Sequence, residues 1–112
     1  MPRPRTYRGR KSQPGNAFLR ACPADWSEQE VSELRRFERA LQLAGVATDI
    51  NFGRSDEGDP WCVICRMGSI EVLAHFARID GTYVGNWDGW NYSRTGDCLN
   101  DVSAHILNRI PF

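Results

Sequence analysis

Residues 70–87 read IEVLAHFARIDGTYVGNW, and this stretch decides the fold that the sequence predicts. Two β-prone runs, 70–79 and 82–87, lie on either side of the pair Asp80 and Gly81. A type I′ turn needs positive φ at both of its central residues, and Asp followed by Gly meets that need. The stretch is therefore predicted to form a β-hairpin.

Two earlier runs extend this hairpin toward the N-terminus. Residues 46–52 alternate between apolar and polar side chains, and residues 61–65 (WCVIC) form a short β-prone run after a polar loop. Residues 88–97 contain several Gly, Asp and Asn residues and are predicted to be a loop. The sequence thus predicts a meander of four antiparallel strands.

A helix is predicted before the strands, at residues 28–44. Ser27 and Glu30 have the spacing of a capping box, in which each side chain accepts a hydrogen bond from the other residue's backbone N–H. Gly45 follows as a residue that tolerates the left-handed backbone found after a helix. Between these signals the apolar residues recur at helical spacing: Val31, Leu34, Phe37, Leu41 and Ala44.

A second helix is predicted near the C-terminus, with Asp97 as its N-cap and Pro111 as its stop. Its apolar residues are Leu99, Val102, Ile106, Leu107 and Ile110. The predicted fold class is therefore α+β, a four-stranded antiparallel meander with helices packed on one face, in the order α-β-β-β-β-α. A chain of 112 residues has room for one such domain, which we place at residues 25–112.

Charge divides the chain into two unlike parts, although 14 Lys and Arg cancel 14 Asp and Glu overall. Residues 1–24 are punctuated by Pro and Gly and hold six cations and no acid. They are predicted to form a basic extended arm. The remaining residues hold eight cations against all fourteen acids, so the domain carries a net charge of −6.

The cellular setting is predicted from what the chain lacks. No run approaches the ~18 apolar residues that a membrane span needs. The basic N-terminus is not followed by the apolar segment of a signal peptide. We therefore expect a cytoplasmic protein with reduced thiols and no membrane contact.

Residues 58–61 (GDPW), at the end of an acidic turn, and residues 74–81 (AHFARIDG) resemble a motif pair of an uncharacterised family of small proteobacterial α+β proteins. The resemblance covers about residues 30–110 and implies a short helix, an acidic turn, a strand and a hairpin. It also implies a bacterial origin, but the family has no known activity that it could transfer to this chain. Cys62 stands where a bulky aromatic residue is expected, which argues against a required thiol there.

The four cysteines raise redox and zinc chemistry as alternatives. Cys62 and Cys65 are three apart on a predicted strand, so their side chains face opposite sides and cannot form a disulfide. Cys22 and Cys98 are isolated, whereas structural zinc usually draws on two closely spaced pairs. We therefore predict no metal and no other cofactor, and we interpret most of the thiols as small buried hydrophobic groups.

The remaining titratable residues do not indicate a catalytic site. In a meander the acidic loop 56–59 lies at the same end as Asp80, and such carboxylates are ligands that Ca²⁺ accepts. Acidic turns are also common simply because they are solvated, and that is the preferred interpretation. His75 and His105 lack the partner spacing of catalytic histidines and are predicted to be structural.

Candidate binding residues lie in the arm and in the loop after the last predicted strand. Cationic side chains of an extended arm neutralise phosphates, and a tyrosine among them stacks on an unpaired base. Aromatic residues in a loop are typical rigid anchors of interfaces. The candidates for binding nucleic acid or a partner are Arg3, Arg5, Tyr7, Arg8, Arg10, Lys11, Trp90 and Tyr92.

These features favour a non-enzymatic binding module. Its body would offer a protein-interaction surface, and its arm would tether it to nucleic acid or a nucleoprotein partner. Two alternatives stay open. The acidic body could imitate nucleic acid and inhibit a nucleic-acid enzyme, or the acidic loop or the cysteines could serve a metal- or thiol-dependent enzyme.

Overall fold

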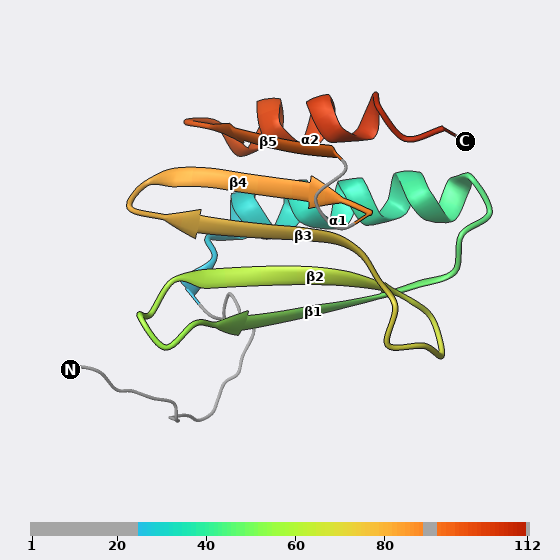
Figure 1. Cartoon of the computed structure of the whole chain (residues 1–112), viewed down its shortest axis with the longest axis horizontal. Coiled ribbons are helices and arrows are strands. Elements are labelled where there is room, and N and C mark those ends of the chain that lie inside the picture. Colours follow the sequence, from blue (N-terminus) through green and yellow to red (C-terminus); the bar gives the residue numbers. More distant parts are fainter. Residues whose placement is uncertain (1–24, 89–91, 112) are drawn as a thin grey trace.

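The computed structural model describes residues 25–88 and 92–111 of the chain. Within them, one antiparallel sheet has the strand order β1-β2-β3-β4-β5, with one helix before it and one after it (Figure 1). The elements in chain order are α1 (Glu28–Leu43), β1 (Thr48–Arg54), β2 (Pro60–Arg66), β3 (Val72–Ile79), β4 (Thr82–Trp87), β5 (Tyr92–Gly96) and α2 (Leu99–Leu107). The predicted α+β class and antiparallel meander are confirmed, and the sheet has a fifth strand.

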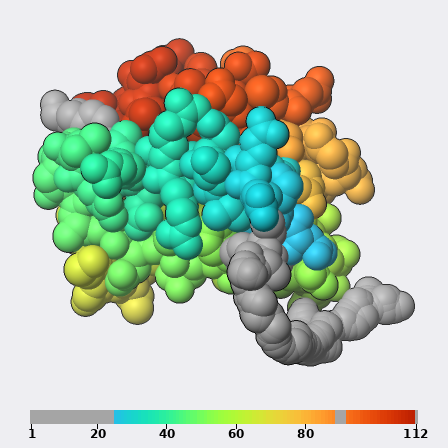
Figure 2. All heavy atoms as spheres, turned by 180° about the vertical axis from the view of Figure 1, so that it is seen from behind, coloured from blue at the N-terminus to red at the C-terminus, as the bar shows by residue number. Residues whose placement is uncertain are grey.

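Both helices lie on the same face of the sheet, as predicted. Figure 1 shows them behind the strands, and Figure 2, which views the molecule from behind, shows α1 and α2 side by side over that face. The core lies between these layers. Phe37 of α1 meets Phe76 of β3 edge to face, with ring centroids 5.0 Å apart. Val102 and Ile106 of α2 are fully buried beside them.

The prediction that residues 88–97 form only a loop is wrong. Tyr92–Gly96 pairs with β4 as an antiparallel edge strand, from Trp87 opposite Tyr92 to Tyr83 opposite Gly96. Its sequence, YSRTG, has no apolar alternation, and its first four residues are exposed. Backbone hydrogen bonds to β4 and contact with α2 hold this strand, and neither leaves a periodic signal in the sequence.

The predicted N-terminus of α1 is confirmed. Ser27 is the N-cap; its Oγ accepts from the Glu30 N–H at 3.1 Å, and the Glu30 carboxylate accepts from the Ser27 N–H at 2.7 Å. The helix ends at Leu43, one residue before the predicted end. Gly45 has a φ of +93°, the left-handed conformation expected there.

The predicted boundaries of α2 need correction. Cys98, and not Asp97, is the N-cap, and no side chain caps the helix there. The helix ends at Leu107, so Pro111 lies beyond its last turn and does not stop it. Ile110 is nevertheless buried in the core. Neither α1 nor α2 is long and apolar enough to cross a membrane.

The predicted hairpin turn is confirmed, with φ of +52° at Asp80 and +79° at Gly81. The start of β3 is shifted: it begins at Val72 and not at residue 70, and Val72 pairs with Cys65 just after the register with β2 shifts. Ile70 lies between the turn at residues 67–69 and β3, and it is 98% exposed.

Gly85 of β4 lets the core close under α2. A Cβ at this position would lie 2.7 Å from Ile106 Cδ1 and 2.8 Å from Phe76 Cε1. Both distances are below any normal carbon–carbon contact. The ring of Phe76 and the side chain of Ile106 therefore meet over Gly85, which has no side chain to separate them.

We expect Gly85→Ala to lower the free energy of unfolding by about 1–3 kcal/mol, because the added methyl group overpacks the core. Gly96→Ala is the matched control in the neighbouring strand, since its Cβ would lie 3.4 Å from Val102 Cγ2. It should change the free energy by less than about 1 kcal/mol. Urea unfolding followed by circular dichroism measures both, and equal costs would contradict this account of the packing.

Candidate functional site

One face of the sheet is left uncovered by the two helices (Figure 1). Residues directly opposite each other on neighbouring strands point to the same face, so the pairing register identifies the residues of this face. We use "open face" for two rows of such partners in the middle of the sheet. The first row is Asn51, Val63, His75, Asn86 and Ser93, and the second is Gly53, Trp61, Ala77, Val84 and Thr95. Neither row contains an acidic or basic side chain other than His75. In a chain with 25% charged residues, this face is unusually neutral.

His75 does not add charge to the open face at neutral pH. Burial lowers the pKa of its imidazole below the usual value, so the ring is neutral. Its Nδ1 lies 3.4 Å from the amide Nδ2 of Asn86, its partner on β4. The contact fits the predicted structural role of this histidine, and it places two groups that can hydrogen-bond at the centre of the open face.

Trp61 lies against the backbone of β1. A Cβ on Gly53 would stand 2.1 Å from Trp61 Cζ2, and 2.5 and 2.6 Å from the two ring carbons bonded to that atom. These distances place the Cβ position above the plane of the ring and not beside its edge. One face of the indole therefore covers Gly53, and the opposite face points away from the sheet. The residue is partly exposed.

The first described residues are fixed at the same end of β1 and β2. Trp26 is 1% exposed, and its Nε1 donates to the backbone oxygen of Trp61 at 3.1 Å. Asp25 forms an ion pair with Arg54, the last residue of β1, at 2.8 Å. The described part of the chain therefore begins at the end of β1 and β2 where Trp61 lies.

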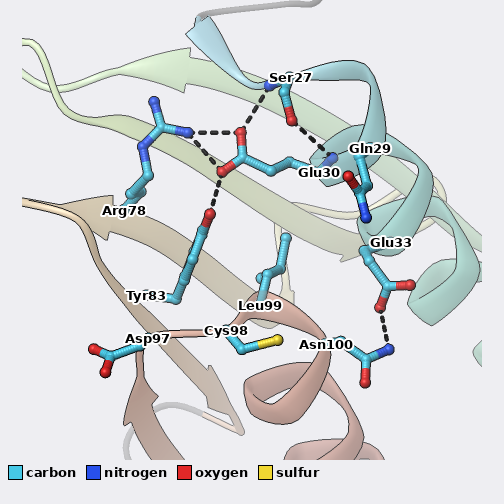
Figure 3. A pocket seen from close by; sticks show the side chains of 10 residues that line it. All are labelled: Ser27, Gln29, Glu30, Glu33, Arg78, Tyr83, Asp97, Cys98, Leu99 and Asn100. Atoms are coloured by element: carbon cyan, nitrogen blue, oxygen red, sulfur yellow. Dashed lines mark hydrogen bonds and ion pairs between the residues drawn. The ribbon is translucent and has the colours of Figure 1, made fainter.

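A second cluster lies on the helix side of the sheet and centres on Glu30 (Figure 3). Arg78 Nη1 donates to both Glu30 oxygens at 2.6 Å, and the Tyr83 hydroxyl donates to Glu30 Oε2 at 2.5 Å. Burial raises the pKa of this carboxyl, but hydrogen bonds from Arg78, Ser27 and Tyr83 and the charge of Arg78 together lower the pKa below its usual value. Glu30 is therefore ionised at neutral pH.

A cavity of about 620 Å³ opens beside this cluster. Figure 3 shows its lining, which comes from α1, the β3–β4 hairpin and the start of α2. Glu30 is already engaged by three neighbours, and Glu33 accepts from the side chain of Asn100 at 2.9 Å. These carboxylates hold the protein's own elements together, so we interpret the cluster as a structural clamp. The lining residues are Ser27, Gln29, Glu30, Glu33, Arg78, Tyr83, Asp97, Cys98, Leu99 and Asn100.

Of the candidate binding residues from the sequence, Tyr92 is the one that the structure describes. It lies at the start of β5, 36% exposed, opposite Trp87 on the helix side, so it is not part of the open face. The others lie outside the described residues: Arg3, Arg5, Tyr7, Arg8, Arg10, Lys11 and Trp90. Sequence reasoning assigned Trp61 to a strand without a role, and it missed the partners of Glu30, which are 48 and 53 residues away.

Cys62 and Cys65 face opposite sides of β2, as predicted. Cys62 is fully buried toward the helices, whereas Cys65 is half-buried on the other side and Cys98 is exposed. The interpretation of most thiols as buried groups is therefore wrong for the cysteines that the structure describes. The loop 56–59 and the turn at Asp80 do share one end of the sheet (Figure 1). Among the residues that the structure describes, however, no three His, Cys, Asp or Glu side chains are grouped to hold a metal ion.

Comparisons with protein-family models, with curated proteins and with solved structures give no significant match to this chain.

We expect Glu30→Gln to lower the free energy of unfolding by about 1–3 kcal/mol at pH 7, because charge-assisted hydrogen bonds to the buried group are lost. Glu28→Gln replaces an exposed acid in the same helical turn; it is the control and should change the free energy of unfolding little.

The effect of Glu30 on stability should also depend on pH. Because the pKa of Glu30 is lowered in the folded protein, its contribution to the free energy of unfolding is present above its unfolded pKa and is lost as the pH falls through the folded value. The difference between wild type and Glu30→Gln should therefore shrink below about pH 4.5. Urea unfolding at several pH values measures it, and a difference independent of pH would contradict the clamp.

We also expect the thiols to differ in reactivity. Burial, followed by the nearby Glu38 carboxylate, raises the pKa of the Cys62 thiol to about 12, whereas Cys98 is exposed. Iodoacetamide at pH 8 should therefore modify Cys98 in the folded protein and reach Cys62 only after unfolding. Peptide mapping by mass spectrometry gives the two rates. Equal modification rates of Cys62 and Cys98 in the folded state would contradict this prediction and support a reactive role for Cys62.

Proposed function

We propose that this chain is a non-enzymatic binding module, in which the basic arm tethers the protein to nucleic acid or a nucleoprotein partner and the body supplies a recognition surface. The observation that carries the proposal is the neutral open face. A sheet face with Trp61, Val63 and Val84 partly exposed, and with the neutral His75 as the one titratable side chain in its two rows, has the composition of a contact surface. The same proposal places the protein in the cytoplasm, within the proteobacterial family that its motifs resemble.

The division of charge supports the tether. Residues 25–112 carry −6, so they repel a phosphate backbone, whereas residues 1–24 hold six cations and no acid. Attraction to phosphate must therefore come from the arm. Each phosphate that a cation neutralises releases counterions, which makes such binding strongly dependent on salt.

A second candidate is supported by the position of the acids. The starts of both helices, the β1–β2 loop and the β3–β4 turn lie at one end of the sheet (Figure 1). An acidic end of this kind could occupy a basic groove in place of nucleic acid. The acids at this end are Asp25, Glu28, Asp56, Glu57, Asp59, Asp80 and Asp97.

The tether is tested with two matched triplets in the full chain. Replacing Arg5, Arg8 and Arg10 by Gln should weaken binding to a labelled 20-nucleotide strand and reduce the slope of log K against log salt by up to about 2. Replacing Arg35, Arg36 and Arg39 of α1, which are exposed, removes the same charge from the body. This control should have a much smaller effect in fluorescence anisotropy titrations at 50–200 mM salt.

Equal effects of the two triplets, or no binding by the wild-type chain, would contradict the tether. Mimicry makes the opposite prediction. A chain without residues 1–22 would still bind its basic protein partner, and its affinity would fall when the acids at the end of the sheet are replaced by their amides.

A further inference from the structure

We propose that the open face binds unpaired nucleotides of a single-stranded nucleic acid, with one base stacked on the outer face of Trp61. This inference rests on the proposed tether and names the part of the ligand that the body recognises. The arm attracts any phosphate backbone, whereas the open face selects strands whose bases are free.

The stacking surface is already formed by the fold. The inner face of the Trp61 ring is held against Gly53, where a Cβ would stand 2.1 Å from the ring. The backbone oxygen of Trp61 is fixed by the indole N–H of the buried Trp26. A ring that is held on one side offers its other side to a planar ligand at little entropic cost. Bases stack on such aromatic side chains with little dependence on sequence.

The charge of the open face fits a base and not a phosphate. A nucleobase is neutral, and the two rows around Trp61 carry no charged group, because their one titratable side chain, His75, is neutral at pH 7. Asn51, Ser93 and Thr95 are exposed polar side chains in these rows, and they can hydrogen-bond to the edges of bases. In a duplex the faces of the bases are covered by their neighbours, so Trp61 has no base to stack on.

The described part of the chain begins at the Trp61 end of the sheet. Asp25 forms an ion pair with Arg54, the last residue of β1, and Gly53 just before it lies opposite Trp61. The proposed tether is therefore attached to the body at the same end of the sheet as the stacking surface.

The test uses the full chain and four probes: labelled (dT)20, labelled (rU)20, a 20-base-pair duplex DNA and a 20-base-pair duplex RNA. Trp61→Ala should weaken binding of the single strands about 5- to 150-fold, the range found for one stacked base. Trp61→Phe keeps an aromatic ring and should stay within a few-fold of wild type. Leu43→Ala removes an apolar side chain that is 76% exposed at the end of α1, outside the open face, and should leave all affinities unchanged.

Binding of the duplexes reports the arm alone and should not respond to Trp61→Ala. The deoxy and ribo probes distinguish the source of the strand, and a preference for either supports the proposal. Circular dichroism checks that each variant folds. If Trp61→Ala does not fold, Asn51→Glu provides the test, since it places a carboxylate at an exposed position two residues from Gly53 and should weaken single-strand binding most.

The outcomes separate this inference from the tether. If the wild-type chain binds single strands and duplexes equally and neither Trp61→Ala nor Asn51→Glu changes the preference, the stacking site does not exist, while the tether stands. If the wild-type chain binds none of the four probes, the tether fails and the inference fails with it.

Discussion

The carboxylate of Glu30 joins the two halves of this fold. It closes the capping box that starts α1, and it also accepts hydrogen bonds from Arg78 and Tyr83 on the two strands of the central hairpin. One side chain therefore sets both where the helix begins and where it sits on the sheet. Such a buried group is favourable only when all its partners are present, because a half-satisfied cluster leaves a charge without compensation in a poorly solvated place.

The position of α1 on the sheet also fixes where the first described residues lie. Once Ser27 caps α1 on the hairpin, Trp26 is directed to the backbone of Trp61 and Asp25 to Arg54. Asp25 is thereby fixed at the end of the sheet that carries most of the exposed acids among the described residues. The clamp thus connects the interior of the protein with two of its surfaces, the acidic end of the sheet and the open face.

Local signals in the sequence predicted most of the fold. The capping box of α1, Gly45 and the Asp80–Gly81 turn are each encoded within a few residues, and all three are confirmed. β5 was missed because an exposed edge strand needs only backbone partners, and its sequence shows no alternation. The clamp was missed because it joins residues 48 and 53 positions apart. Trp61 and Gly53 face each other only once the register of β1 and β2 is known, although a glycine within an alternating run is a signal of close approach.

The acids at the Asp25 end of the sheet set the conditions under which the proposed tether would work. In the proposed function, the cations of residues 1–24 are attracted near neutral pH both to the carboxylates at this end of the body and to the phosphates of a ligand. Attraction between solvated charges is screened over about 8 Å at physiological ionic strength, so salt weakens both contacts together. Stacking on Trp61 and hydrogen bonds on the open face are much less sensitive to salt. In the proposed function, a ligand that offers unpaired bases as well as phosphates therefore competes better with the body's own acids than a phosphate backbone alone does, and selectivity between ligands comes from the neutral face.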